Sequence, residues 1–243
     1  MQDLRLTFIG SGNAFSPGGL CCNGFLLNDR VLFEAPPQTL GSLHQVGVDP
    51  NELEVVVLGH HHGDHFLGLP FLLLHWKWKG RTKPVRIIGP KATEALAKDI
   101  AQKVFPGVLD AVYDIEWVVA EAGKACRVNG LELEPVRVEH DDELSATLGY
   151  GVRFGGRRLA YTGDTRLCDG VFDIARGAEL MVSECASRSD SIPIHMNLVG
   201  DMPRVRAALP AASSLILTHI SPDVDNGNLP NTVVARDFAT YRL

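Results

Sequence analysis

Residues 55–65 read Val55-Val56-Val57-Leu58-Gly59-His60-His61-His62-Gly63-Asp64-His65, an apolar run followed at once by a cluster of metal-binding side chains. A short continuous run of β-branched residues is typical of a strand that is buried on both faces. Side chains in the loop after such a strand can converge on a ligand without disturbing the sheet. The stretch therefore predicts a metal site at the end of a buried strand.

The cluster offers four histidines and one aspartate within six residues. Neutral imidazole and carboxylate are the usual ligands of catalytic zinc, which keeps one position open for water. His60 and His62 alternate and can point the same way from an extended turn, with His61 pointing away. Asp64 and His65 follow the flexible Gly63 and can face a second ion, so we predict two metal ions. The alternative is a polar loop rich in histidine, because a single buried histidine is commonly structural.

Length and composition predict one globular domain over residues 1–243, with a tightly fused pair of half-domains as the alternative. The chain is 45% hydrophobic and 21% charged, as in ordinary soluble proteins. The N-terminus lacks the pattern of a signal peptide, and no apolar run is long enough to cross a bilayer. Five cysteines, two of them adjacent, suit neither a disulfide framework nor a metal clip. We therefore expect a cytoplasmic protein with reduced thiols and no membrane partner.

The formal net charge of −6 argues against a general polyanion binder, although a locally basic groove stays open. One basic, aromatic stretch, residues 75–83, follows the histidine cluster and reads His-Trp-Lys-Trp-Lys-Gly-Arg-Thr-Lys. Interleaved aromatic and cationic side chains can stack on bases and meet phosphates. The stretch is therefore our first candidate for substrate contacts, and a helix end with core tryptophans is the alternative.

Apolar periodicity and turn residues predict alternating strands and helices along the whole chain. A hairpin turn is expected at Asn28-Asp29, and a helix over 197–209 is expected to be capped by Asn197. The pattern favours an α/β fold of stacked sheets with helices outside. The other predicted helices cover 37–46, 69–79 and 91–104, and the predicted strands cover 4–9, 24–27, 31–33, 55–58, 85–88, 113–119, 131–139, 148–154, 158–162, 179–183 and 214–218.

The cluster resembles the HxHxDH motif of the metallo-β-lactamase fold superfamily, and the likeness extends along nearly the whole chain. The other matching segments are Gly10-Ser11-Gly12, Val138-Glu139-His140 followed by Leu148-Gly149-Tyr150, Tyr161-Thr162-Gly163-Asp164-Thr165, and Leu217-Thr218-His219-Ile220-Ser221. The resemblance implies a four-layered αββα sandwich. It also implies two Zn²⁺ ions per chain, with Mn²⁺ or iron as alternatives.

The resemblance also implies which side chains hold these ions. One metal would be bound by His60, His62 and His140. The other would be bound by Asp64, His65 and His219, and Asp164 would bridge both. Two adjacent divalent ions lower the pKa of a shared water and stabilise charge that develops on substrate oxygens. Asp64 is therefore counted among the catalytic residues as well as the ligands.

The segment before His140 indicates which branch of the superfamily the chain resembles. It reads Arg137-Val138-Glu139-His140, whereas glyoxalase-like and β-lactamase-like members usually carry Thr-Pro-Gly-His. The segment is instead similar to the ribonuclease Z-like branch, which includes tRNA 3′-processing enzymes, cyclic phosphodiesterases and arylsulfatase-like members. Members of that branch commonly form homodimers, which the resemblance implies here.

Two further residues are candidates for the reaction. In the same branch a histidine lies near the substrate phosphate, between the bridging aspartate and the last ligand, and His195 matches it by position and by leading a helix. Its imidazole could donate a proton to the leaving oxygen or stabilise the transition state. Glu184 could orient a ligand or His195 from behind. The alternative for His195 is a surface residue at a helix cap.

The resemblance has one gap, between the third histidine and the bridging aspartate. Classical tRNA-processing members insert a long arm there, but only 23 residues separate His140 from Asp164. Intact tRNA is therefore not expected as a partner unless another subunit supplies the arm. We expect a phosphodiesterase that uses metal-bound hydroxide on a small or short single-stranded phosphodiester. Alternatives are hydrolysis of a sulfate ester, lactone or other ester, a non-enzymatic metal-binding scaffold, and a two-iron oxidoreductase.

Overall fold

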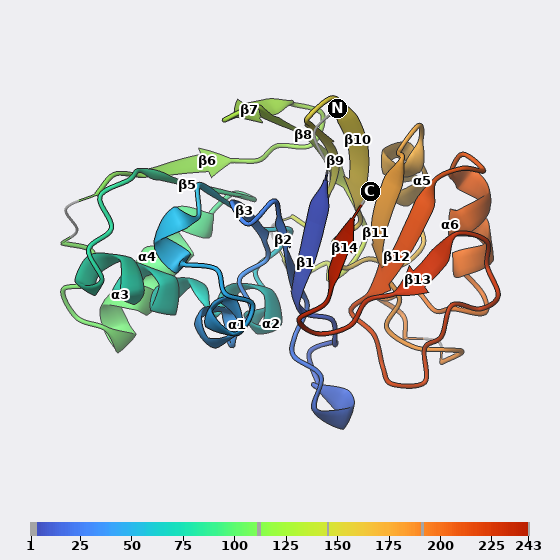
Figure 1. The fold of residues 1–243 in the computed structure, drawn as a ribbon, viewed down its shortest axis with the longest axis horizontal. Coiled ribbons are helices and arrows are strands. Elements are labelled where there is room, and N and C mark those ends of the chain that lie inside the picture. Colours follow the sequence, from blue (N-terminus) through green and yellow to red (C-terminus); the bar gives the residue numbers. More distant parts are fainter. Residues whose placement is uncertain (1–3, 111–112, 145, 191, 243) are drawn as a thin grey trace.

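The computed structural model describes residues 4–110, 113–144, 146–190 and 192–242. The first three residues, on which part of the signal-peptide prediction rests, lie outside this range. The described residues form two seven-stranded sheets that lie against each other (Figure 1). The first sheet runs in the order β14 (Thr240–Arg242), β1 (Arg5–Gly10), β2 (Gly24–Leu27), β3 (Val31–Phe33), β4 (Val55–Val57), β5 (Val85–Gly89) and β6 (Ile115–Val119).

Like the first sheet, the second sheet contains both parallel and antiparallel strand pairs. Strands β10 to β13 are parallel neighbours, whereas β7 to β10 pair as antiparallel hairpins. Its order is β13 (Thr232–Val234), β12 (Ser214–Thr218), β11 (Leu180–Glu184), β10 (Arg157–Tyr161), β9 (Leu148–Phe154), β8 (Leu131–Arg137) and β7 (Cys126–Val128).

Three separate apolar cores hold four layers together. Strand β4 shows why, since Val55 and Val57 point into the core between the sheets and Val56 points into the core under the helices. Both faces of this strand are buried, as its β-branched run predicted. The αββα sandwich is confirmed. The first sheet is covered by α1 (Thr39–Gln45), α2 (Gly63–Phe66), α3 (Leu69–Trp78) and α4 (Thr93–Val104), and the second by α5 (Asp169–Ala175) and α6 (Met202–Ala208) (Figure 1).

The hairpin between β2 and β3 is confirmed, and Asn28 and Asp29 both adopt positive φ, at 49° and 59°. These residue types tolerate that backbone conformation in a tight turn. The predicted helix over 197–209 is wrong at its start, because α6 begins at Met202. The side chain of Asn197 instead accepts a hydrogen bond from the amide of Gly200, which closes a turn before the helix. Helix α5 and the three-residue strands β7, β13 and β14 were not predicted, because elements this short carry little periodicity.

The basic, aromatic stretch at the end of α3 is largely structural. Trp76 is fully buried, and the guanidinium of Arg81 stacks on its ring at 4.9 Å. Arg81 is only 1% exposed and donates hydrogen bonds to the carbonyls of Asn51 and Leu53, at 3.0 and 2.6 Å. The stretch therefore anchors α3 to the short helix η2 (Pro50–Glu52). No residue of this stretch lines the cavity at the histidine cluster, so the predicted substrate contacts are not found there.

We expect Arg81→Met to lower the free energy of unfolding by about 3 kcal/mol, because it leaves buried carbonyls without donors. Urea denaturation of wild-type and variant protein would measure the change. The Michaelis constant for any substrate should stay unchanged. A variant with wild-type stability and a raised Michaelis constant would contradict this structural role and indicate that the stretch contacts the substrate.

None of the described helices combines the length and the apolar character that a membrane-spanning helix needs.

Candidate metal centre

The histidine cluster lies where the carboxyl ends of strands from both sheets meet. Residues 60–65 follow β4 of the first sheet, and three polar side chains follow β8, β10 and β12 of the second sheet. These three are His140, Asp164 and His219. Connecting loops at strand ends can bring side chains together while the sheets stay intact. The site is thus built from two halves of the chain, one from each sheet.

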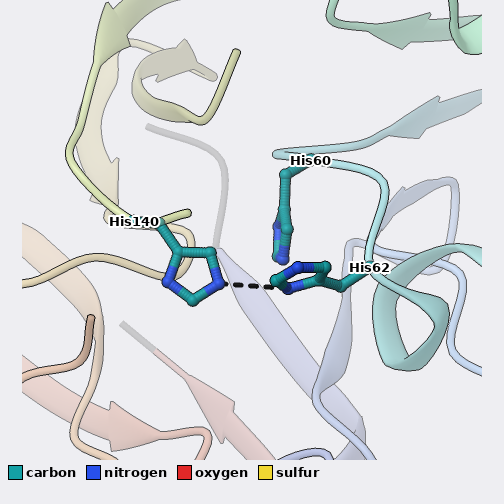
Figure 2. Close-up of side chains that lie close together, drawn as sticks. All are labelled: His60, His62 and His140. Carbon is teal, nitrogen blue, oxygen red and sulfur yellow. Dashed lines mark hydrogen bonds between the residues drawn. The ribbon is translucent and has the colours of Figure 1, made fainter. Parts of the chain in front are cut away.

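His60, His62 and His140 form the first group of metal-binding side chains. One ring nitrogen of each lies within 4.8 Å of the others, and the three rings converge in Figure 2. Nε2 of His140 lies 3.1 Å from Nδ1 of His62. The three ring atoms can therefore share one cation.

Contacts behind these rings determine which nitrogen faces the centre. Nε2 of His62 lies 3.2 Å from Oδ2 of Asp141, and Nδ1 of His140 lies 2.9 Å from the carbonyl oxygen of Ile194. Oxygen atoms of a carboxylate and a carbonyl only accept, so the protons lie on these outer nitrogens. The two nitrogens that face each other then both carry lone pairs. Such an arrangement is repulsive unless a cation lies between them, and outer partners of this kind orient metal ligands.

Asp64, His65, Asp164 and His219 form the second group, again with donor atoms within 4.8 Å of one another. Nε2 of His65 lies 3.1 Å from Oδ2 of Asp64 and 3.1 Å from Oδ2 of Asp164. His219 adopts a positive φ of 54°, a conformation that is costly for a residue with a side chain. Strain of this kind is concentrated at functional sites, where surrounding contacts hold it in place.

Asp164 lies between the two groups. Its Oδ2 atom is 3.1 Å from Nε2 of His65 and 3.1 Å from Nε2 of His219. The same atom is 3.9 Å from Nε2 of His60 and 4.0 Å from Nε2 of His140. Burial by itself would raise the pKa of Asp164, but His219 and His65 outweigh it and hold the pKa well below its usual range. The carboxylate is therefore charged and within reach of both groups.

Several buried polar atoms of these groups have no hydrogen-bond partner in the described residues. They include both ring nitrogens of His60, Oδ1 of Asp164 and Nδ1 of His219. An unsatisfied buried polar atom costs about 1–3 kcal/mol, so a cluster of them is not expected without a ligand. Imidazole nitrogen and carboxylate oxygen are the donors that divalent zinc prefers. The residues present fit metal ions at both groups.

Glu34 lies behind this centre and was not singled out from the sequence. It follows β3, is fully buried, and adopts a positive φ of 62°. Its Oε1 atom accepts hydrogen bonds from the amide of Gly59 and the hydroxyl of Tyr161, and its Oε2 atom lies 3.7 Å from Nδ1 of His65. Burial raises the pKa of Glu34. The signal in the sequence that could have identified it is an acidic residue directly after the apolar run at 31–33.

His195 and Glu184 contact each other beside the two groups. A hydrogen bond of 2.8 Å joins Nδ1 of His195 to Oε1 of Glu184, the contact that the sequence suggested. Burial would lower the pKa of His195, but Glu184 outweighs it and raises the pKa to about 9. Divalent cations at the neighbouring groups would lower that pKa again, because like charges repel. His195 lies in a loop ahead of α6, so the expectation that it leads a helix and the helix-cap alternative are both wrong.

A cavity of about 250 Å³ opens above the two groups. His195 forms part of its wall, and ligand-type side chains of both groups form its floor. His61 points elsewhere, as predicted, because its Nε2 atom lies 2.7 Å from the hydroxyl of Thr93 on α4. The remaining lining comes from Asn13, Ala14, Phe15, Ala186, Ile192 and Ile194.

Known proteins resemble this chain over almost its full length. Residues 29–220 match the family model described as the Beta-lactamase superfamily domain. An uncharacterized protein of Mycobacterium leprae is 32% identical, over 90% of this chain and 78% of its own length. The ribonuclease Z of Pyrobaculum arsenaticum is 28% identical, over 91% of this chain and 88% of its own length.

Solved structures agree with these sequence matches. A metallo-β-lactamase fold protein from Bacillus subtilis has a TM-score of 0.79 and 18% identity, over 99% of this chain and 100% of that one. At this identity the match shows the fold, while the family model and the relatives show the family. The chain belongs to the metallo-β-lactamase fold superfamily.

Proposed function

We propose that residues 1–243 form one dinuclear zinc-dependent phosphodiesterase that acts on a small or short single-stranded phosphodiester. The observation that carries this proposal is Asp164, whose Oδ2 atom lies within 4.0 Å of histidines from both ligand groups. A shared carboxylate between two sets of imidazoles is the arrangement that a two-metal hydrolase needs. Similarity to a ribonuclease Z supports phosphodiester chemistry.

Each proposed metal would have its own ligand set. His60, His62 and His140 would hold one ion, and Asp164 would be shared. The second ion would be held by Asp64, His65 and His219. Zinc suits imidazole and carboxylate donors best, with Mn²⁺ or iron as the alternatives. Bound metals would supply Lewis-acid activation of water and stabilisation of negative charge on the substrate.

His195 is the proposed general acid. Its Nδ1 atom is engaged by Glu184, which leaves Nε2 as the nitrogen that a substrate in the cavity can reach. A protonated Nε2 can donate to the leaving oxygen, which otherwise departs as a costly alkoxide. The buried carboxylate of Glu184 keeps the ring in place and favours the protonated form. Glu184 is thus a positioning residue for His195.

The connection between His140 and Asp164 supports a small substrate. In the described part of that segment, strands β9 and β10 form a hairpin that packs into the second sheet. The chain between them turns at Gly155 and Gly156, which both adopt positive φ. This connection is a tight turn and leaves no room for an inserted arm, so intact tRNA is not the proposed substrate.

The test is an assay of purified, zinc-loaded protein against four substrate classes. These are bis-p-nitrophenyl phosphate, a 2′,3′-cyclic nucleotide, an aryl sulfate and a lactone. We expect turnover of at least one phosphodiester, its loss after chelation, and its return with zinc. Metal analysis should give about two ions per chain. Turnover of the sulfate or lactone with no activity on either phosphodiester would reject the phosphodiesterase proposal and favour the other ester class.

A further inference from the structure

Phe15 is an exposed aromatic side chain at the mouth of the cavity. It is 88% exposed, the largest value among the exposed large hydrophobic side chains of the described residues. It also lines the cavity above the two ligand groups. A solvated aromatic ring beside a catalytic floor is typical of a contact that is completed by a ligand.

The loop that carries Phe15 is held to the rest of the site. Oδ1 of Asn13 accepts a hydrogen bond from the amide of Phe15 at 3.1 Å. Nδ2 of the same side chain donates to the hydroxyl of Ser221 at 3.1 Å and to the carbonyl of Ala186 at 3.5 Å. Asn13 is itself buried, so its amide ties the loop to the chain segments that follow β12 and β11. The backbone under Phe15 is therefore fixed although its ring is exposed.

Other side chains that line the cavity are also apolar. Ile192 and Ile194 line the cavity, and Ala186 continues the same surface. The carbonyl of Ile194 accepts the hydrogen bond from Nδ1 of His140, so this part of the lining is joined to the first ligand group. An apolar group attached to the reacting atom could thus contact Phe15 and the two isoleucines, which line the same cavity.

The described lining of the cavity offers positive charge only at its floor. Among the described residues, neither a lysine nor an arginine lines this cavity. Only the floor can compensate negative charge, through His195 and any bound metals. A second anionic group on the substrate would be buried against apolar side chains without a partner, which is costly. The cavity of about 250 Å³ is also small compared with typical ligand pockets.

We infer that Phe15, Ile192 and Ile194 form a specificity subsite for a flat, uncharged aromatic group carried by a singly anionic ester. This inference rests on the proposed function, since the ester is the phosphodiester of that proposal. The aromatic group would stack against Phe15, and the isoleucines would add apolar contacts from the same lining. Phe15 is the residue that this subsite needs most, because its ring becomes covered only when the ligand binds.

Binding of three phosphonates to the zinc-loaded protein tests the subsite without relying on turnover. Isothermal titration calorimetry would compare methylphosphonate, phenylphosphonate and 4-carboxyphenylphosphonate. We expect phenylphosphonate to bind about tenfold more tightly than methylphosphonate, because its ring fills the apolar subsite. The added carboxylate should remove about that much affinity, since the described residues of the lining include no lysine or arginine.

Phe15→Ala should abolish most of the preference for phenylphosphonate and leave methylphosphonate affinity unchanged. Trp78→Ala is the matched control, because Trp78 is an exposed aromatic residue that does not line the cavity. Equal affinities for the three phosphonates, or an unchanged preference in Phe15→Ala, would overturn the subsite. A retained, Phe15-dependent preference in a protein that hydrolyses no phosphodiester would support the subsite and reject the proposed function.

Discussion

Asp164→Asn is expected to lower the metal content of the protein from about two ions per chain to one or fewer. Turnover should fall on the order of a thousandfold or more, because both proposed metals lose a shared anionic ligand. The asparagine keeps the shape and one oxygen of the side chain but removes the negative charge. Four histidine rings within 4.0 Å of that charge would then lack the anion that offsets the metal charges. Elemental analysis and a kinetic assay on the same preparation would measure both effects.

Asp141→Asn is the matched control for this change. Asp141 is also an aspartate beside the site, so the same substitution can be made there, but its Oδ2 atom lies 3.2 Å from the outer nitrogen of His62 and not between the two groups. Loss of such an outer partner typically weakens metal binding by about 10–100-fold. The control should therefore keep both metals when zinc is in excess. An Asp164→Asn protein that retained two ions and wild-type turnover would show that Asp164 is not the shared ligand.

His195→Ala is expected to reduce kcat by about 10²–10⁴-fold while the metal content stays near two per chain. The reason is that His195 lies beside the ligand groups and is held by Glu184, 2.8 Å away. The donor atom of His195 also lies within 4.8 Å of donor atoms of His140 and Asp164, so metal ligation is the competing role. Loss of a metal ion in His195→Ala would therefore contradict the general-acid role.

The pH profile gives a second test of the same residue. A general acid works only when protonated, so activity that depends on His195 is present below its pKa and is lost as pH rises through it. Glu184 raises that pKa to about 9 in the metal-free protein, and bound metals would lower it. Glu184→Gln removes the charge and should move the basic limb of the profile to lower pH. His195→Ala should lack this limb altogether.

The local part of the site was predictable from sequence because it lies within one short segment. Six consecutive residues after a β-branched strand carry His60, His62, Asp64 and His65, and their spacing is preserved in any fold. The β-branched run also identified β4 as a strand buried on both faces, which the structure confirms. Short-range patterns of this kind survive folding because neighbours in sequence stay neighbours in space.

The residues from the second sheet were located by resemblance, and the structure places their side chains at the same centre. His140 and His219 are 79 residues apart in the sequence, and both have a donor atom within reach of Asp164. Their roles as ligands stay a prediction until metal is measured. Periodicity along either strand could not have shown that the two strand ends meet.

Other features required the packed chain. The position of Glu34 behind His65 could not be predicted from the sequence. It arises because β3 and β4 are parallel neighbours, which brings the two side chains together. The start of α6 was mispredicted because a turn at Asn197 competes locally with the helix. Arg81 similarly looked like a ligand for phosphate until its guanidinium was found buried against backbone carbonyls.

The amino-acid sequence by itself indicated an α/β fold and a cluster of metal-binding side chains at residues 60–65, and its resemblance to a known family implied the αββα sandwich and the other ligands. Those features depend on local spacing, strand character and motif order, which can be read directly along the chain. Tertiary structure supplied the distances that place Asp164 between the two groups and Glu184 against His195, and it showed that Phe15 lines a cavity to which the described residues contribute no lysine or arginine. These depend on distances between segments far apart in the chain, and only the packing of two sheets sets such distances.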